Sequence, residues 1–172
     1  MRDSLDIALV RVDNRLVHGQ ILEAWVPFLN ASCIVVADDQ VASDFFRETV
    51  IRMAVPSDVR VVINSVAELA ENTAFQRGCG PTTIVLFSTI SAALAAFNLG
   101  FRFDKLNIGN IYNEECRLCC TQSVQLNDGD IRDITDLRNV GVQIELRRVP
   151  REKPVDLFEI VRRMGPDAPT SV

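Results

Sequence analysis

The only histidine of the chain, His18, lies in a short stretch that also holds Arg11 and Arg15. A histidine side chain is largely neutral and nucleophilic near neutral pH, so it can attack a phosphoryl group. The phosphohistidine that results carries negative charge, which guanidinium groups and backbone amides can bind. Phosphoryl transfer mostly needs positioning and charge stabilisation. The residue types and their spacing therefore indicate a site that handles phosphate.

The surroundings of His18 support this interpretation. An apolar run precedes the stretch at residues 7–10, and apolar residues at helical spacing follow it. These residues are Ile21, Leu22, Trp25, Val26 and Leu29. A strand that leads through a polar loop into a helix is where open α/β proteins place ligands, and the first turn of a helix favours anions. The alternative is an exposed or capping histidine on an ordinary loop.

The residues beside His18 have more than one role open to them. Asp13 can hold the loop by pairing with Arg15 or by capping the helix, and a carboxylate near the histidine can also fix its tautomer. Gly19 gives the backbone room near a bulky partner. Gln20 can donate a hydrogen bond to a phosphate oxygen, or it can face solvent on the first turn.

Polar residues also follow two later apolar runs. Asp38 and Asp39 end the run at 33–37, and paired carboxylates there could bind Mg²⁺, although Asp39 as the N-cap of the next helix is the simpler interpretation. Ser88 and Thr89 end the run at 83–87. The Ser88 hydroxyl is a candidate for lining the mouth of the site and binding phosphate, with helix capping as its alternative.

The five cysteines form no disulfide-scaffold pattern, and their odd number fits a reducing compartment. Cys116 and Cys119 have the spacing of a zinc-binding pair, and Cys120 follows them. A zinc site needs four ligands, however, and the only histidine is distant in sequence. We therefore expect no metal and no organic cofactor.

Bulk properties exclude several classes of protein. A chain of 172 residues suits one domain, which we place at 1–165 with a flexible tail at 166–172. The net charge of −5 argues against nucleic-acid and anionic-membrane binding. No stretch approaches the ~20 apolar residues of a membrane-spanning helix, and the N-terminus lacks the apolar core of a signal peptide. We expect a cytoplasmic protein, and its apolar content is compatible with a homodimer.

Apolar runs alternate with helical patterns along the whole chain. Strands are expected at 6–12, 33–37, 59–63, 83–87, 105–109, 123–126 and 142–147, the last at a sheet edge with one face in solvent. Helices are expected at 18–29, 40–54, from 65, and at 92–98, 131–140 and 155–164, with an irregular segment at 110–121. In the helix at 40–54, apolar residues at amphipathic spacing predict a buried face. This alternation predicts an α/β fold with a mostly parallel, doubly wound sheet.

Residues 11–20 read Arg-Val-Asp-Asn-Arg-Leu-Val-His-Gly-Gln. This stretch closely resembles the signature of the IIB components of the mannose/fructose/sorbose class of the bacterial sugar phosphotransferase system. Later stretches resemble family landmarks in the same order, at 33–39, 53–56, 84–88 and 106–109, so that the resemblance covers about residues 6 to 164. The chain departs from the family pattern at Asn14, at Gly109-Asn110 and in the segment 110–121.

The resemblance implies a protein-phosphohistidine–sugar phosphotransferase. His18 would accept a phosphoryl group from a phosphohistidine on a IIA protein or domain and pass it to a sugar carried by a IIC/IID membrane permease, which would bring the protein to the inner membrane. Arg15 and Arg11 would stabilise the phosphate, and Asp13 would orient the loop. Two alternatives stay open, a regulatory phospho-acceptor of an incomplete relay and a ligand-binding α/β domain without covalent chemistry.

Overall fold

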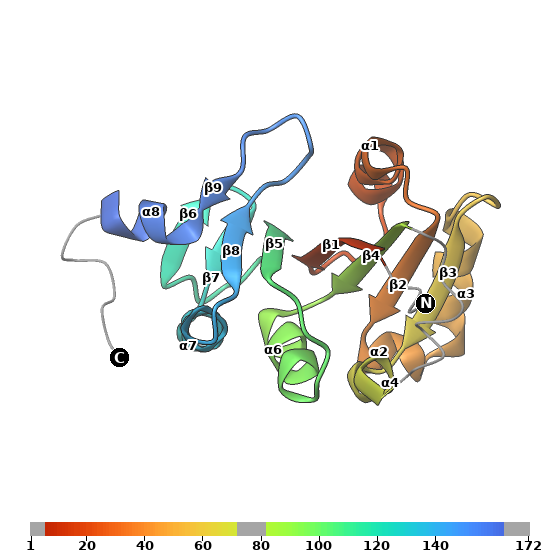
Figure 1. Ribbon diagram of the computed structural model, residues 1–172, viewed down its shortest axis with the longest axis horizontal. Coiled ribbons are helices and arrows are strands. Elements are labelled where there is room, and N and C mark those ends of the chain that lie inside the picture. The colour runs from red at the N-terminus through yellow and green to blue at the C-terminus, as the bar shows by residue number, and fades with distance from the viewer. Residues whose placement is uncertain (1–5, 72–81, 164–172) are drawn as a thin grey trace.

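The computed structural model describes residues 6–71 and 82–163, and a seven-stranded sheet runs through them (Figure 1). The strand order is β3-β2-β4-β1-β5-β8-β9, and every neighbouring pair is parallel except β8 and β9. The bounds are β1 Asp6–Asp13, β2 Cys33–Ala37, β3 Arg60–Asn64, β4 Thr82–Phe87, β5 Lys105–Asn110, β8 Gln143–Leu146 and β9 Val155–Asp156. The predicted doubly wound α/β fold is confirmed.

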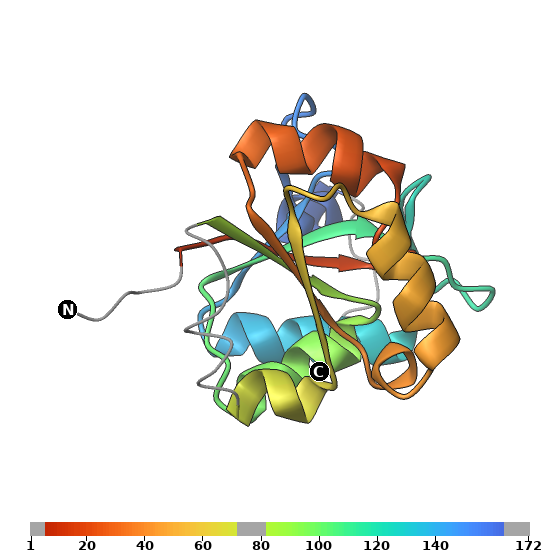
Figure 2. The same ribbon diagram turned by 90° about the vertical axis from the view of Figure 1, so that its right-hand side faces the viewer.

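Helices cover both faces of this sheet, as Figure 2 shows. Their bounds are η1 Gln20–Trp25 (a π-helix), α1 Val26–Leu29, α2 Asp39–Ala42, α3 Phe45–Ala54, α4 Val66–Glu71, α6 Ile90–Asn98, α7 Asp128–Asn139 and α8 Leu157–Arg163. Side chains of η1 and α1 pack with one face of β2 and β4 in one apolar cluster. Side chains of α4, α6 and α7 pack with the other face in a second cluster. None of the described helices is both long and apolar enough to span a bilayer.

The order of the strands places a topological switch point between β1 and β4. From β1 the chain moves through η1 and α1 to β2 and then outward to β3, whereas from β4 it moves through α6 in the opposite direction to β5. Val12 near the end of β1 is in register with Phe87 at the end of β4. Ligands of open α/β sheets bind where the strand order reverses, outside the carboxyl ends. The loop that carries His18 begins there.

The predicted helix at 40–54 is two helices, α2 and α3. The Asp44 side chain accepts hydrogen bonds from the backbone N–H groups of Phe46 and Arg47 and so caps a new helix at Phe45. The cap of α2 also differs from the prediction, since the Asp38 carboxylate, not that of Asp39, accepts from the Val41 N–H. Asp39 accepts instead from the Val66 N–H at the start of α4.

The apolar face predicted for residues 40–54 was expected to be buried, and this expectation is wrong for α3. Of its apolar residues, Phe45 is 84% exposed, Phe46 75%, Met53 82% and Val50 50%. Val41 on α2 is buried as expected. The spacing correctly identified an apolar face, but this face points to solvent.

Three further differences concern the C-terminal half. Part of the expected irregular segment is a strand, β6 Leu118–Thr121, which pairs with β7 Val124–Leu126 in an antiparallel hairpin. The strand expected at the edge, β8, is covered by the short β9, which takes the first residues expected in the final helix. Helix α7 begins at Asp128 because Asn127 and Asp130 form a capping box. The expected tail at 166–172 lies outside the described residues.

Candidate functional site

The loop after β1 is a tight turn whose backbone is strained at Leu16. Leu16 has a φ of 54°, in the left-handed region that side chains other than glycine rarely adopt, and its side chain is buried in the core. The Leu16 N–H donates to the Asp13 carbonyl at 2.9 Å, which closes the turn. The Leu16 carbonyl lies 2.8 Å from Nδ1 of His18. An anchored side chain and a strained backbone thus place an acceptor directly against the histidine ring.

His18 is held between two oxygen atoms. The contact with the Leu16 carbonyl assigns the ring proton to Nδ1, because a carbonyl oxygen can only accept. Nε2 lies 3.6 Å from Oδ2 of Asp13, is closed to solvent, and has no hydrogen-bond partner among the described residues. The side chain is 16% exposed. The ring must therefore turn about its side-chain torsions before either nitrogen can meet a phosphoryl donor.

Asp13 is the buried carboxylate that holds this loop together. Its Oδ2 accepts from Nη2 of Arg11 at 2.9 Å, and its Oδ1 accepts from the Arg15 backbone N–H at 3.1 Å and from Arg15 Nε at 3.3 Å. The prediction that Asp13 holds the loop by pairing with Arg15 is confirmed. Among the ion pairs of the described residues, Asp13 is also the carboxylate that lies against the His18 ring, with its Oδ2 3.6 Å from Nε2.

The structure corrects the role expected of Arg11. Its side chain is fully buried, and its guanidinium donates to Asp13, to Oδ1 of Asn107 at 2.6 Å and to the backbone carbonyls of Arg147 and Arg148 at 2.9 and 3.2 Å. Burial lowers the pKa of this guanidinium, and the charge of Asp13 opposes the shift. A group with these partners cannot contact a phosphate. Arg11 therefore positions Asp13 and does not bind the transferred group.

Arg15 is the arginine that faces the mouth of the site. Its side chain is 43% exposed, and its Nη2 donates to Oε1 of Gln20 at 3.1 Å. Gln20 opens the helix η1, and exposed Gly19 stands between it and His18. The first amides of a helix have no partner within it, so those of Gly19 and Gln20 are available to an anion. The structure thus brings Arg15, Gly19 and Gln20 together beside His18, as predicted.

Ser88 lies at the same sheet edge but has another partner. Its hydroxyl donates to Oδ2 of Asp38, whose Oδ1 caps α2. In this structure the hydroxyl proton of Ser88 is thus donated to a carboxylate. Phosphate binding by Ser88 stays a prediction. Thr89 caps α6, as the alternative interpretation had it. In the described residues no group of acidic, histidine and cysteine side chains could hold a metal ion.

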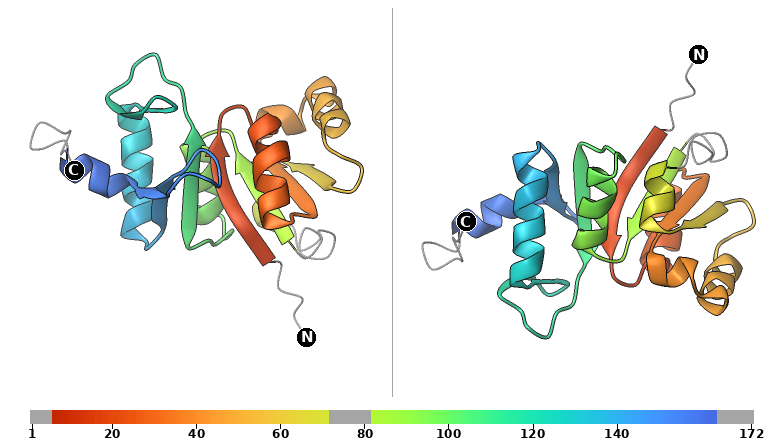
Figure 3. Two further views of the ribbon diagram at one scale, coloured as in Figure 1. Left: turned by 90° about the horizontal axis from the view of Figure 1, so that it is seen from above. Right: turned by 90° about the horizontal axis from the view of Figure 1, so that it is seen from below.

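The loop at 147–153 is a part of the site that the sequence did not indicate. Figure 3 (left) shows it reaching over β1 toward η1, and Nε1 of Trp25 donates to the Arg148 carbonyl at 3.1 Å. Within the loop, Arg147 donates to the carbonyls of Pro150 and Glu152, while Arg148 pairs with the Glu152 carboxylate at 3.0 Å. These contacts fix the loop, and its backbone carbonyls at Arg147 and Arg148 accept from Arg11.

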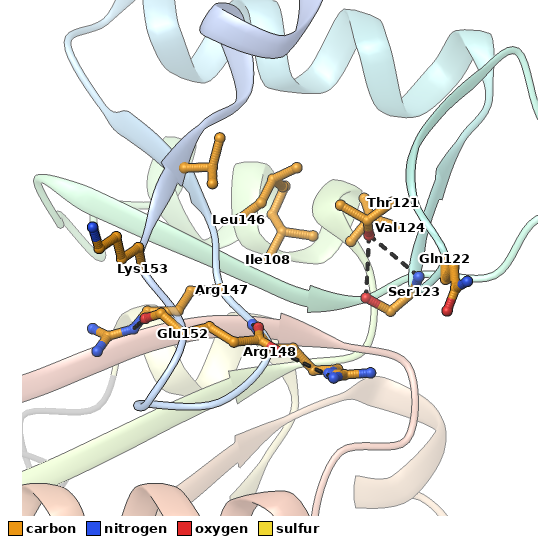
Figure 4. A pocket seen from close by; sticks show the side chains of 11 residues that line it. Ile108, Thr121, Gln122, Ser123, Val124, Leu146, Arg147, Arg148, Glu152 and Lys153 are labelled. Carbon is orange, nitrogen blue, oxygen red and sulfur yellow. Dashed lines mark hydrogen bonds and ion pairs between the residues drawn. The ribbon is translucent and has the colours of Figure 1, made fainter.

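Two cavities flank this loop. One of about 620 Å³ lies between the exposed side of η1 and α1 and residues 149–151, directly beside Gly19 and Gln20. The other, of about 370 Å³, lies at the carboxyl ends of β5 and β8, under the turn of the β6–β7 hairpin. Figure 4 shows Arg148 and Glu152 paired at its wall and Thr121 and Ser123 bonded to each other. The first cavity is the one that adjoins the histidine loop.

The cysteines differ from expectation. Cys116 and Cys119 form a disulfide, so the interpretation of unpaired thiols from a reducing compartment is wrong for these two. Sulfur atoms bonded to each other are not metal ligands, which removes this pair as a zinc site. Cys120 is free, and burial raises the pKa of its thiol to about 11.

Comparisons with known proteins agree with this geometry. The model of the family described as "PTS system sorbose subfamily IIB component" matches residues 7–170. The chain is 32% identical to the fructose-specific EIIB component of Bacillus subtilis (strain 168), over 93% of this chain and 98% of that protein. It is 29% identical to the N-acetylgalactosamine-specific enzyme IIB component 2 of Escherichia coli (strain K12), over 91% of this chain and 99% of that protein.

A solved structure supports the same relationship. The IIBSor domain of the sorbose permease from Klebsiella pneumoniae superimposes with a TM-score of 0.82 at 27% identity, over 93% of this chain and 98% of that one. The resemblance predicted from residues 11–20 is thus confirmed across nearly the whole chain.

Proposed function

This chain belongs to the sorbose subfamily of IIB components of the sugar phosphotransferase system, and we propose that His18 is the residue that carries the phosphoryl group. The protein is a phosphotransferase of sugar uptake. One observation supports His18 most strongly. The only histidine of the chain lies at the switch point of the sheet, with half-exposed Arg15 on one side and buried Asp13 behind it.

The transfer requires His18 to meet a phosphohistidine of a IIA donor. The lone pair of one imidazole nitrogen attacks the phosphorus in line, an N–P bond forms, and the donor's N–P bond breaks and returns its electron pair to the donor imidazole. In the second transfer the oxygen of a sugar hydroxyl in the permease attacks the phosphorus and an O–P bond forms. The His18 N–P bond breaks and returns its electron pair to the imidazole, which takes up the hydroxyl proton. Both bonds of the first step are alike, so the protein mainly has to position the groups and offset charge.

Each neighbour of His18 has a distinct task in this proposal. Arg15 exchanges its contact with Gln20 for the phosphoryl oxygens, because it is the half-exposed cation of the loop. The backbone N–H groups of Gly19 and Gln20 complete the anion site. Asp13 keeps the loop in place as the histidine ring turns outward, and Arg11 fixes Asp13 from inside the core.

The partners follow from the family. IIB components act between a IIA phosphoryl donor and a IIC/IID permease, and both must reach His18 in turn. We place the protein in the cytoplasm and at the inner membrane when the permease binds it. The cavity beside Gly19 and Gln20 adjoins the reacting group and is open to either partner. A second copy of the chain completes the assembly as a homodimer.

A two-step phosphate relay tests the proposal. The purified chain and its His18→Gln variant are incubated with phosphoenolpyruvate, the general phosphotransferase proteins and a IIA shown to be competent on another IIB. Intact mass is expected to show one acid-labile phosphate on the wild type and none on the variant. Permease-containing membranes and sugar are then added.

The second step separates the functional alternatives. Loss of the phosphate that depends on both the sugar and the permease supports transport. A stable phosphoprotein would instead identify a regulatory acceptor. Absence of any adduct would contradict the carrier role and leave a binding domain.

A further inference from the structure

Three polar side chains form a row across the interior of the sheet. Arg11 on β1 is in register with Asn107 on β5, and Asn107 is in register with Glu145 on β8. All three are buried, with at most 6% of each residue exposed. Neighbours in register on adjacent strands present their side chains to the same face of a sheet. The row therefore crosses three adjacent strands on one face.

Hydrogen bonds connect the row in a fixed order. Nη1 of Arg11 donates to Oδ1 of Asn107 at 2.6 Å, the shortest of the four bonds that this guanidinium makes within the described residues. Nδ2 of Asn107 donates to Oε1 of Glu145 at 3.3 Å and to the Arg147 carbonyl at 3.2 Å. Oε2 of Glu145 pairs with Nζ of Lys105 at 2.5 Å, and this lysine is 51% exposed. A half-exposed cation thus balances the buried carboxylate at the end of the row.

The partners of Asn107 leave its amide only one orientation. A guanidinium can only donate, whereas a carboxylate and a backbone carbonyl can only accept. Oδ1 must therefore face Arg11 while Nδ2 faces Glu145 and the Arg147 carbonyl, and a flipped amide would lose all three contacts. The acceptor that Asn107 offers to Arg11 is accordingly fixed on a central strand of the sheet.

The row reaches the histidine through Asp13. Because Nη1 of Arg11 is bonded to Asn107 and to the Arg147 carbonyl, Nη2 is directed to Oδ2 of Asp13 at 2.9 Å. The same oxygen lies 3.6 Å from Nε2 of His18. A guanidinium is planar and rigid, so the direction of one of its arms sets the direction of the other. A rotation of Arg11 would therefore disturb the oxygen that lies beside the imidazole ring.

The stability of the fold does not account for this row. In the sequence its members stand between apolar residues of buried strands, as in Leu106-Asn107-Ile108. Buried polar groups must give up their hydration, and replacing a bonded set of them by apolar side chains is often neutral or stabilising. Polar side chains at these positions therefore favour a role in the site to which the row leads.

We propose that Asn107 is a positioning residue for the phosphoryl transfer and acts on His18 through Arg11 and Asp13. Glu145 fixes the Asn107 amide, and the amide fixes the direction of the Arg11 guanidinium. Asp13 is thereby held beside the imidazole and keeps its place when the ring turns outward to the donor. This inference rests on the proposed carrier role of His18 and names a residue, outside the histidine loop, on which the rate of that step depends.

Asn107→Leu tests the role, because leucine is similar in size and offers no acceptor. The Arg11 guanidinium loses its shortest bond and is free to rotate, so phosphate uptake from a IIA donor should slow about 10-fold. Nuclear magnetic resonance should show shifted signals of the single imidazole, although Arg11 and Asp13 stand between it and Asn107. Both measurements are made well below the Tm of each variant.

Leu106→Ala is the matched control. Leu106 precedes Asn107 on β5 and is fully buried in the apolar cluster on the opposite face of the sheet. The variant loses a buried side chain from the same strand, so its Tm should fall at least as far as that of Asn107→Leu. Its rate of phosphate uptake and its imidazole signals should nevertheless be those of the wild type. A change seen in Asn107→Leu alone therefore reports positioning and not stability.

Glu145 supplies a second test, which decides the matter if Asn107→Leu does not fold. Glu145→Gln keeps an oxygen that accepts from Nδ2 of Asn107, so this variant should retain most of the wild-type rate. Glu145→Leu removes the acceptor and should slow phosphate uptake about 3-fold. Lys105 is half-exposed and turns to solvent in both variants, so that the two differ in the acceptor alone.

A wild-type rate or unmoved imidazole signals in Asn107→Leu would overturn the proposal. An equal loss of rate in Leu106→Ala at the same loss of Tm would overturn it as well, and so would equal rates in the two Glu145 variants. In each of these outcomes the wild type still takes up one phosphate at His18. Failure of the carrier role would instead appear as a wild type without phosphate, so the two failures are distinct.

Discussion

Gly109→Ala should disrupt the site from within the core, although Gly109 is far from His18 in sequence. A Cβ atom at this position would lie 1.7 Å from Nη2 and 1.9 Å from Cζ of Arg11. The guanidinium has no solvent-filled space around it, since Arg11 and its neighbours on the adjacent strands are buried. The guanidinium must therefore leave its place by about 2 Å to restore ordinary contact distances.

The cost follows from the contacts that this movement breaks. Arg11 donates to Asp13, Asn107 and two backbone carbonyls over 2.6–3.2 Å, and none of these bonds survives a displacement of that size. Breaking a buried ion pair costs about 3–5 kcal/mol. In a chain of this length that corresponds to a fall in Tm of about 10 °C. Asp13 also loses the cation that fixes it, so phosphate uptake at His18 should slow about 10-fold or more.

A double-mutant cycle isolates the contact. Thermal unfolding is measured for the wild type, Gly109→Ala, Arg11→Ala and the double variant. Without the guanidinium the new methyl group has room, so Gly109→Ala should cost less than about 1 kcal/mol in the Arg11→Ala background. Gly129→Ala, at the start of α7, is the comparison and should cost much less than Gly109→Ala, because its Cβ would lie 3.1 Å from Oδ1 of Asn127, a contact that a shift of a few tenths of an ångström relieves. An equal penalty in both backgrounds, or a Tm unchanged by Gly109→Ala, would refute the reasoning.

Three other changes separate the roles of individual side chains. Arg15→Ala should slow phosphate uptake about 100-fold with little change in Tm. Arg117 is an exposed arginine beside the hairpin, and Arg117→Ala should change neither the rate of uptake nor Tm. An unaltered rate in Arg15→Ala would remove Arg15 from the site. Ser88→Ala should lower the free energy of unfolding by about 1 kcal/mol and leave phosphate uptake unchanged. A loss of uptake as large as that of Arg15→Ala would instead identify Ser88 as a phosphate ligand. Because burial raises the pKa of Cys120 to about 11, its thiolate is scarce at mildly alkaline pH. Iodoacetamide, followed by peptide mass, should modify it far more slowly than free glutathione and faster as the pH approaches that pKa; an equal rate would contradict its burial.

Local sequence patterns predicted the strands and the histidine motif well. The β-branched runs that became β2 and β4 are buried on both faces, and such runs have few alternatives. The motif at 11–20 was informative because its residue types are specific to one chemistry. Burial of Arg11 was less evident, although its place inside an expected strand was a signal for it.

Long-range contacts and the direction of apolar faces could not be predicted. Arg11 is in register with Asn107, which is 96 residues away, and sequence order does not show which strands become neighbours. A polar residue inside the apolar strand β5 was the available signal for Asn107. In α3, helical spacing identifies the apolar face, but it does not tell whether that face meets the core or solvent. The loop at 147–153 has no motif, and only the fold brings its carbonyls to Arg11.

The central claim is that the phosphoryl group resides on His18, and nuclear magnetic resonance of the single imidazole tests it most directly. Because the chain has one histidine, its ring protons give one assignable pair of signals. After transfer from the IIA donor, we expect this pair to shift completely, together with one phosphoramidate signal in the phosphorus spectrum. Both changes should be absent in His18→Gln. A phosphorylated protein whose imidazole signals do not move would place the phosphate on another residue and contradict the account.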